Sequence, residues 1–552
     1  MLRIIMIKKV SCRSLTVLLF AFFAGMDVDM ANAQSAGPNI LFLTVDDMSC
    51  DSIGTFGCAV PDTTPNIDRL ATEGLRFTRA HVQVGNCMPS RNVMQSGLYP
   101  HNNGVEGFYQ ITERSYKILP ELLKDAGWFV GIKGKVPHTT PAEFEWDVVL
   151  QPDTPGNLRN REWFYKQTVE GIEMARAQNK PFYLVINIVD PHTPFYGMNN
   201  RSQLIDDPLK PSKIFSPDEI TVPVFLPDTP QTRLELAHYY SSVRRADDCV
   251  GEVLKALTDC EVEDNTLLMF LSDHGMPFPF AKTTVWHHGT HTPWIVRWPG
   301  VVKPGTSDDY HMISAVDFTP TILDVVGVQN PGKMDGRSFL PLLRNEKQGN
   351  RDYIVKVYNE NAGGHRHPMR SIQTRDFAYI FNPWSDGTNR FRTATQGMQT
   401  YKEMIRLAED DSKAAERLRI FDYRDYEEFY NCRADPDNLH NLINVPEYSE
   451  EIEKLRQELE RWMERTGDHM LAVFRNRNNR EAASSYVQAK QAESDARRRK
   501  KKTKARDNIK KLKGIIKMQV PVQARCNAPV SITINHNLPP KLKQQPLHKT
   551  AR

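Results

Sequence analysis

The chain has 552 residues, of which 40% are hydrophobic and 25% charged, and this composition is typical of a folded, water-soluble protein. Its length exceeds what one small core supports, so we expect a large domain with a smaller one. The net charge is +4, but residues 481–552 hold 18 Lys and Arg against 4 Asp and Glu, which leaves −10 for the rest. The body is therefore acidic and the C-terminal end basic, and we expect no nucleic-acid partner.

Residues 1–33 have the pattern of a secretory signal. Basic residues precede a 12-residue apolar run at residues 15–26, and an Ala-Asn-Ala sequence ends at Ala33. The run is too short to cross a bilayer as a helix, which favours cleavage over the alternative of a membrane anchor. No later segment has 18 consecutive apolar residues. We therefore expect an exported protein without a membrane span in the mature chain, either periplasmic or secreted, or lysosomal in a eukaryote.

Eight cysteines are present, and Cys12 would leave with the signal. The remaining odd number implies at least one unpaired thiol unless a cysteine bonds another chain. A Cys50–Cys58 disulfide stays open, because spacing alone does not establish pairing.

Three buried, apolar segments alternate with helical patterns in residues 34–350. They are residues 39–45, 181–195 and 265–275, and each ends in polar residues. The helical patterns cover residues 64–77, 115–126 and 232–257. This alternation predicts an α/β fold with an open, mostly parallel sheet and a site along its carboxyl edge.

The pattern changes after residue 350. Strand-like runs within residues 370–384 and 427–443, and an amphipathic helix over 447–468, predict a smaller α+β domain with an antiparallel sheet at residues 351–478. Residues 479–552 become polar and then basic. We favour a disordered, solvated tail there over a polyanion-binding one.

The stretch CMPSRNVMQSG, from Cys87 to Gly97, resembles the signature of type I sulfatases. In that family a separate maturase oxidises the cysteine to formylglycine (3-oxoalanine). The resemblance implies an alkaline-phosphatase-like fold and a hydrated aldehyde at position 87 that attacks sulfur. It also implies that Arg91, four residues further on, holds this hydrate and the charge beside the metal. The alternative for Arg91 is a surface salt bridge.

A cation would be needed to neutralise an anionic sulfate ester, and hard oxygen ligands suit Ca²⁺ or Mg²⁺. Asp46 and Asp47 follow the first predicted strand, and Asp273 and His274 follow a later one. The resemblance implies that these four residues and Cys87 bind Ca²⁺, with Mg²⁺ as the alternative. Otherwise each acid caps a helix or a turn.

Other motifs resemble the sulfate-binding elements of the family. Lys135 and Lys282 match its two sulfate-binding lysines, and His192, in DPHTPF, matches the histidine that faces the leaving group. His138 stands three residues after Lys135, where many members have the histidine two residues after the lysine. The resemblance makes His138 a residue that stabilises the hydrate or takes its proton, and His192 a general acid.

The chain departs from the family in the loop after Lys282. His287 replaces a glutamate and His291 an arginine, so both are candidates for substrate binding, although packing within the loop is equally compatible. His365, within residues 359–370, is a further candidate, since the family fold brings the C-terminal domain over the pocket.

Several stretches, among them HNNGVEGFY and DHGMPFPFAKT, are closer to heparan N-sulfatases than to sulfatases at large. We predict a sulfatase of sulfated sugars, with N-sulfoglucosamine as the first candidate substrate, that depends on a formylglycine-generating maturase. The alternatives are a phosphatase or phosphonate monoester hydrolase of the same superfamily, and a non-catalytic polyanion-binding protein.

Overall fold

The computed structural model describes residues 37–111, 113–151, 158–329 and 332–519. The predicted signal, residues 1–33, and the end of the predicted tail, residues 520–552, lie outside this part. The chain up to Ser494 forms one compact unit, and the chain from Asp495 onward forms a second.

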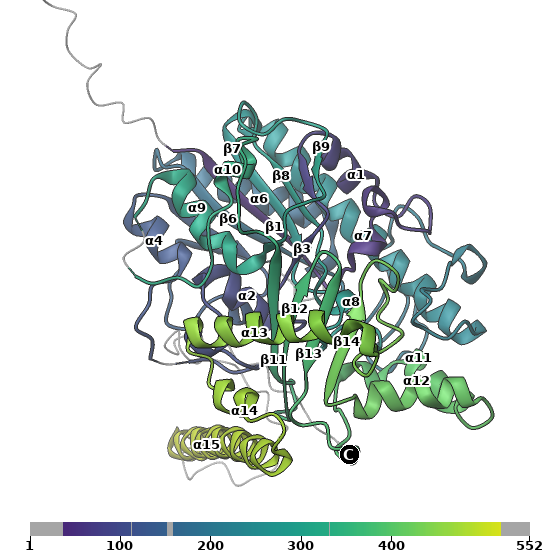
Figure 1. The fold of residues 1–552 in the computed structure, drawn as a ribbon. Coiled ribbons are helices and arrows are strands. Elements are labelled where there is room, and N and C mark those ends of the chain that lie inside the picture. The colour runs from purple at the N-terminus through teal and green to yellow at the C-terminus, as the bar shows by residue number, and fades with distance from the viewer. Residues whose placement is uncertain (1–36, 112, 152–157, 330–331, 520–552) are drawn as a thin grey trace, which may run out of the picture. The chain divides into compact units, whose positions relative to one another are not determined.

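An eight-stranded sheet forms the centre of the first unit (Figure 1). Its order is β5-β4-β6-β1-β7-β8-β2-β9, and β8 is the strand that runs antiparallel to both of its neighbours. The predicted mostly parallel sheet is therefore confirmed. The strands are β1 (Asn39–Asp46), β2 (Leu75–Phe77), β4 (Phe129–Lys133), β5 (Val148–Leu150), β6 (Phe182–Pro191), β7 (Thr266–Ser272), β8 (Trp294–Arg297) and β9 (Thr306–Asp308).

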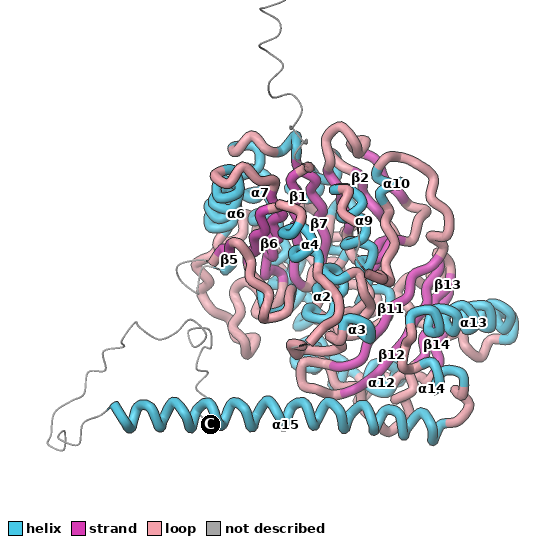
Figure 2. The backbone as a smooth tube through the Cα atoms, turned by 90° about the vertical axis from the view of Figure 1, so that its left-hand side faces the viewer, coloured by secondary structure: helices cyan, strands magenta, loops and turns pink. Residues whose placement is uncertain are grey.

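Helices cover both faces of this sheet because both faces of its central strands are apolar. In β1, Leu41 and Leu43 point into one core, and Ile40 and Phe42 into another. The first core is closed by α1 (Pro65–Thr72), α6 (Arg161–Arg176) and α7 (Pro230–Asp259). The second is closed by α2 (Cys87–Ser96), α4 (Leu119–Asp125), α9 (Phe318–Val326) and α10 (Leu340–Leu343). Figure 2 shows the two helical layers on either side of the strands.

A four-stranded antiparallel sheet follows, as predicted, in the order β11-β12-β13-β14. Helix α13 (Ser449–Thr466) lies across this sheet and contacts β12 and β13 (Figure 1). The strands are β11 (Tyr353–Glu360), β12 (Arg366–Thr374), β13 (Phe377–Phe381) and β14 (Glu427–Asn431). The remaining elements are β3 (Ala80–His81), β10 (Ile313–Ser314), α3 (Pro100–Asn103), α5 (Val136–Thr139), α8 (His287–Thr290), α11 (Gln399–Leu407), α12 (Ser412–Tyr423), α14 (Leu471–Arg475) and several 3₁₀ turns.

The start of the predicted disordered tail is helical instead. Helix α15 spans Arg480–Gln519, and its first turns bury Ala483 and Ser494. Tyr486 on the same turns meets His469, with its hydroxyl 2.8 Å from Nδ1 of the imidazole. Charge composition indicated disorder, but Ala, Lys, Arg and Gln are also strong helix formers, and the buried residues anchor the helix.

Candidate active site

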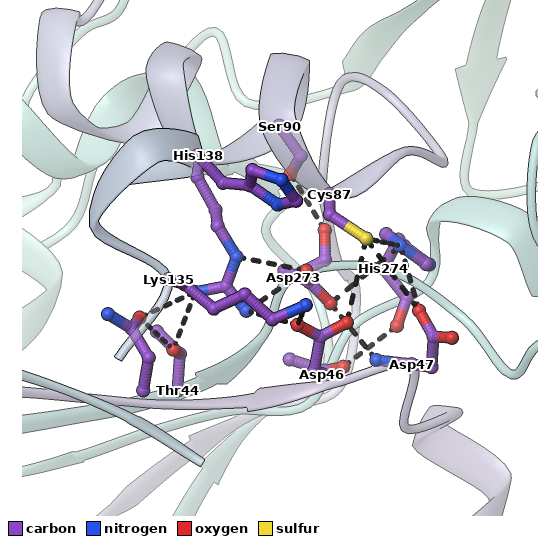
Figure 3. Close-up of polar contacts among 12 residues, drawn as sticks. Thr44, Asp46, Asp47, Cys87, Ser90, Lys135, His138, Asp273 and His274 are labelled. Atoms are coloured by element: carbon purple, nitrogen blue, oxygen red, sulfur yellow. Dashed lines mark hydrogen bonds and ion pairs between the residues drawn. The ribbon is translucent and has the colours of Figure 1, made fainter. Parts of the chain in front are cut away.

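Four side chains that could hold a metal ion converge at the carboxyl edge of the large sheet (Figure 3). Asp46 ends β1 and Asp47 follows it, Cys87 is the first residue of α2, and His274 follows β7. All four are buried, and one ligand atom of each lies within 4.8 Å of the others. The alternative that Asp46 and Asp47 merely cap a helix or turn therefore has no support in this geometry.

The backbone is turned sharply beside three of the site residues. Asp47, Lys135 and Thr283, the neighbour of Lys282, have φ values of 67°, 52° and 69°, in the left-handed region that side chains disfavour. Residues held in this region concentrate at functional sites, where the surrounding packing maintains them. Here the turns direct Asp47, Lys135 and Lys282 toward the Cys87 side chain.

Cys87 is held as a thiol and not as a thiolate. Its Sγ lies 3.5 Å from Oδ1 of Asp46, 3.9 Å from Oδ1 of Asp47 and 3.2 Å from Nε2 of His274. Burial, and next the Asp46 carboxylate, raises the pKa of the Cys87 thiol well above its usual range. Catalytic cysteines instead lie in electropositive sites that lower the thiol pKa, so this position does not suit a thiolate nucleophile.

Arg91 joins two of the site carboxylates from inside the protein. Its Nη2 lies 3.3 Å from Oδ2 of Asp46, and its Nε lies 3.0 Å from Oδ2 of Asp273. Nη1 donates to the Thr44 hydroxyl at 2.9 Å and to the Asn187 amide oxygen at 2.5 Å. Arg91 is 2% exposed, so the alternative of a surface salt bridge is wrong.

Asp273, a predicted metal ligand, stands outside the group of four. Arg91 occupies its Oδ2, and the backbone N–H of Asp47 donates to its Oδ1 at 3.1 Å. Its nearer oxygen, Oδ1, lies 3.8 Å from Nε2 of His274. Asp273 therefore fixes Arg91 and the Asp47 turn in this structure.

The two predicted sulfate-binding lysines pair with Asp46, the last residue of β1, and with Asp47 after it. Nζ of Lys135 lies 2.6 Å from Oδ2 of Asp46, and Nζ of Lys282 lies 2.7 Å from each oxygen of Asp47. Burial alone would raise the pKa of Asp46, but Lys135, His192 and Arg91 hold that pKa well below its usual range. The Asp46 carboxylate is therefore kept ionised, as a metal ligand must be.

The orientation of His274 fits a bound cation. Its Nδ1 lies 2.9 Å from the Gly275 carbonyl, which only accepts hydrogen bonds, so Nδ1 carries a proton. Nε2 then turns toward Oδ1 of Asp47 at 3.1 Å. A nitrogen lone pair and a carboxylate repel each other at that distance, and a metal ion bound by both atoms would remove this repulsion. This arrangement is common in metal sites, where a carbonyl orients the ligating imidazole.

A cavity of about 650 Å³ opens above Cys87 and Lys282. His192 and His365, two of the predicted substrate-binding residues, line it, and so does His138, the predicted proton acceptor. Residues 136–139 form one turn of helix, in which the N–H of His138 donates to the Lys135 carbonyl at 2.9 Å. This turn brings His138 back to the side of Lys135, which accounts for the extra residue between them.

His287 and His291 do not line that cavity, so their predicted substrate contact has no support here. Their rings pack on each other with centroids 4.5 Å apart, and both pack on His81. Nε2 of His291 meets the Thr78 carbonyl at 2.9 Å. Packing within the loop is the interpretation that the structure favours, because both rings contact His81 of β3 and neither residue lines the cavity that contains Cys87.

Sequence patterns missed several residues of the cavity wall. Arg390 and Arg392 come from the segment between β13 and α11, where no family motif drew attention to them. Asn86 is the residue before the CMPSR stretch and its position alone could have indicated a role. The wall also includes Phe108, Thr393, Ala394 and Gln396, together with Asn361, Ala362 and Gly363 from residues 359–370, which were expected to lie over the pocket.

The model of the sulfatase family matches residues 38–328, which include every strand of the large sheet. The chain belongs to the sulfatase family. A second model, described as the C-terminal part of N-sulphoglucosamine sulphohydrolase, matches residues 273–386 of this sulfatase. The resemblance predicted from CMPSR is therefore confirmed, and the protein is a sulfuric ester hydrolase.

Two curated relatives are similar to this sulfatase over most of their length. N-sulphoglucosamine sulphohydrolase of Homo sapiens is 30% identical over 473 residues, covering 78% of this chain and 90% of that protein. An ulvan-active sulfatase of Formosa agariphila is 27% identical over 474 residues, covering 78% of this chain and 75% of that protein.

Solved structures share the fold of this sulfatase at lower identity. One is a protein in complex with its substrate D-glucosamine-2-N,6-O-disulfate, with a TM-score of 0.59 and 19% identity, covering 78% of this chain and 99% of that chain. Another is the phosphonate monoester hydrolase of Agrobacterium radiobacter, with a TM-score of 0.59 and 16% identity, covering 78% and 96%. These likenesses confirm the alkaline-phosphatase-like fold class.

Two predictions about cysteines and membranes concern the described residues only. Cys50 and Cys58 are both free thiols there, so the open Cys50–Cys58 disulfide is not formed. None of the helices within residues 37–519 combines the length and the apolar character needed to cross a bilayer.

Proposed function

We propose that this sulfatase removes sulfate from a sulfated sugar, using formylglycine made from Cys87 and a bound Ca²⁺ ion. The observation that carries the proposal is the buried group of Asp46, Asp47, Cys87 and His274 at the bottom of a cavity with a lysine on each aspartate. Ca²⁺ is preferred to Mg²⁺ because Ca²⁺ tolerates irregular coordination, whereas Mg²⁺ demands near-ideal octahedral geometry.

The divalent cation and formylglycine would each supply one part of the chemistry. A divalent cation held by Asp46, Asp47, His274 and the residue at position 87 would neutralise charge on the ester and polarise an S–O bond. Asp273 joins the proposed ligand set if binding draws its carboxylate inward from Arg91. Formylglycine, in its hydrated form, would supply the attacking oxygen and the means of releasing sulfate.

The lysines and Arg91 would bind and position the charges. An ammonium group has three N–H donors, and Lys282 uses two of them on Asp47, which leaves one for a sulfate oxygen. Lys135, next to Asp46, would bind the sulfate from the other side. Arg91 would hold Asp46 in place and stabilise the oxygen at position 87 from the helix side.

The histidines at the cavity would move protons. Nδ1 of His192 lies 2.6 Å from the Thr193 carbonyl, so Nε2 is the nitrogen turned toward Asp47, 3.9 Å from Oδ2. In the imidazolium form of His192 that nitrogen carries a proton, which it would give to the departing oxygen or nitrogen of the sugar. His138, whose Nδ1 has no hydrogen-bond partner among the described residues, would hold the proton of the hydroxyl at position 87.

The cavity and the relatives support a sulfated sugar as the substrate class. A volume of about 650 Å³ lies within the range of roughly 300–1,000 Å³ that small-molecule sites usually have. His365 lines it from the C-terminal region, to which the N-sulphoglucosamine sulphohydrolase model extends. N-sulfoglucosamine is therefore the first substrate to test, followed by O-sulfated glycans. The predicted signal at residues 1–33 supports export of the chain. A maturase would recognise CMPSR during this export.

Two measurements test the proposal. Mass spectrometry of the peptide with position 87, from protein exported by a host that has the maturase, should show a mass about 18 Da below that of the thiol. The same protein should hydrolyse 4-nitrophenyl sulfate faster than the matching phosphate and phosphonate esters. An unmodified Cys87 without turnover of any ester would favour the polyanion-binding alternative, and faster turnover of the phosphorus esters would favour a phosphatase or phosphonate monoester hydrolase.

A further inference from the structure

The segment from Arg390 to Gln396 forms part of the cavity wall, to which it contributes Arg390, Arg392, Thr393, Ala394 and Gln396. Arg390, Arg392 and Ala394 are exposed, whereas Phe391 and Thr393 between them are buried. This alternation is that of an extended chain with one face against the protein. Arg390, Arg392 and Ala394 all line the cavity that contains Cys87 and Lys282.

The two arginines differ in what neutralises them. Nη2 of Arg390 lies 3.0 Å from Oδ2 of Asp422, and its Nε lies 3.1 Å from the same oxygen. Arg392 has no ion pair with a carboxylate in the described part of the chain, and its Nη1 lies 3.4 Å from Nε2 of His365. A guanidinium that meets an imidazole and no carboxylate keeps its full positive charge for a ligand.

The backbone under Arg392 is fixed relative to the sulfate end of the cavity. Its carbonyl accepts a hydrogen bond from Nδ2 of Asn361 at 2.6 Å. The hydroxyl of Thr283, the residue after Lys282, donates to the Thr393 hydroxyl at 2.5 Å. The residues that follow Lys282 and Arg392 are therefore hydrogen-bonded to each other, so the fold sets the distance between the backbones of Lys282 and Arg392.

A second segment beside Arg392 is a tight turn that ends at His365. Oδ1 of Asn361 accepts from the N–H of His365 at 2.9 Å, so the same Asn361 side chain contacts both this turn and the Arg392 backbone. Helix α15 supports this turn from behind, since Gln491 Nε2 and Ser494 Oγ each donate to the Gly364 carbonyl at 3.0 Å. His365 and Arg392 thus face one volume from two held segments.

The lining of the cavity is cationic. It contains Lys282, Arg390, Arg392 and three histidines, and none of the residues that form it carries a carboxylate. Lys282 is matched by Asp47 and Arg390 by Asp422, which leaves Arg392 as the charge without a carboxylate partner. A single sulfate group placed beside residue 87 for cleavage would bind Lys135 and Lys282, and it would leave Arg392 without a ligand.

We propose that Arg392, together with His365, binds a second anionic group of the substrate, so that doubly anionic sugars are preferred. The inference rests on the proposed sulfatase function and specifies its substrate class. The shared chemistry is a planar or tetrahedral oxyanion that accepts two guanidinium N–H donors. Its source is either a second sulfate on the same sugar or the carboxylate of an adjoining uronic acid.

The test compares substrates that differ by one anionic group. Glucosamine N-sulfate, glucosamine N,6-O-disulfate and an N-sulfated disaccharide with a uronic acid are each assayed with Arg392→Lys, Arg392→Gln and Arg392→Glu. The ratio of kcat/KM for a doubly anionic substrate to that for glucosamine N-sulfate should fall about tenfold in Arg392→Gln, the loss expected for one charge-assisted contact. It should fall further in Arg392→Glu and least in Arg392→Lys.

The anionic source and the role of charge are read from the same data. A fall confined to the disulfate assigns the subsite to sulfate, and a fall confined to the disaccharide assigns it to a carboxylate. The KM of wild type for the affected substrate should rise with ionic strength more steeply than that of Arg392→Gln. Arg406→Gln, which removes an arginine from α11 outside the cavity, is the matched control and should leave the ratio unchanged.

Two outcomes would overturn the inference. One is an equal ratio in wild type and all three Arg392 variants, and the other is a ratio that falls as much in Arg406→Gln. If wild type releases sulfate from none of these sugars, the proposed function has failed instead. Equilibrium binding of the disulfate to wild type and Arg392→Gln then decides the subsite alone, since equal affinity would refute it and about tenfold weaker binding by the variant would support it.

Discussion

Replacing Asp47 with Asn should destabilise the metal-free protein and abolish its activity through one lost charge. Nζ of Lys282 lies 2.7 Å from both oxygens of Asp47, and its ammonium has no other hydrogen-bond partner among the described residues. Both side chains are buried. Asp47→Asn therefore leaves a buried ammonium without its partner, a change that costs about 3–5 kcal/mol in the free energy of unfolding.

The double variant Asp47→Asn/Lys282→Met separates this cost from catalysis. It removes both charges together, so most of the lost stability should return, because a neutral pair needs no compensating charge. Activity should stay absent in both single variants and in the double variant. Asp47→Asn removes a proposed metal ligand, and Lys282→Met removes a proposed sulfate-binding group. Removing both charges together restores neither of these functions.

Thermal unfolding of chelator-treated protein is the assay. An unfolding entropy of about 2 cal/mol/K per residue, summed over a unit the size of the one that ends at Ser494, converts 3–5 kcal/mol into roughly 3–5 °C of Tm. Circular dichroism of each variant checks that the fold persists. If metal-free Asp47→Asn melts with wild type, or if the double variant melts at the sum of the two single losses, the buried ion pair does not carry the stability assigned to it.

Three further predictions concern the metal, the leaving group and helix α15. Chelation should remove sulfatase turnover and lower Tm, and added Ca²⁺ should restore both, since a ligand bound only to the folded state stabilises it. Persistence of turnover in the presence of chelator would exclude a catalytic metal. His192→Ala should lower turnover of a sugar sulfate about 10²–10⁴-fold and of 4-nitrophenyl sulfate much less, because nitrophenolate leaves without a proton; equal losses would contradict a general acid. A chain that ends at Ser494 should keep the wild-type KM, whereas one that ends at Asn479 should show a higher KM because Gln491 and Ser494 no longer hold the Gly364 carbonyl. Equal KM values for the two chains would show that helix α15 does not support the turn at His365.

Local sequence determined the strands, the position of Cys87 and most of the charged groups of the site. The apolar runs before Asp46 and His274 predicted buried parallel strands, because a strand covered on both faces needs apolar side chains throughout. Parallel strands present their carboxyl ends at one edge, so the meeting of these residues with Cys87 also followed from sequence. CMPSR drew attention to Cys87 because the residues of this motif are adjacent in sequence, so the motif can be recognised without knowledge of the fold.

Tertiary packing decided what each remaining side chain touches. His287 and His291 are residue types that often bind substrates, yet both of their rings pack against His81, and no local pattern encodes that contact. Arg392 has no motif around it and acquires its position from contacts with Asn361 and, through Thr393, with Thr283, more than a hundred residues earlier. Sequence periodicity reports which face of an element is buried, whereas the partner of a buried or cavity-lining charge depends on how distant elements meet.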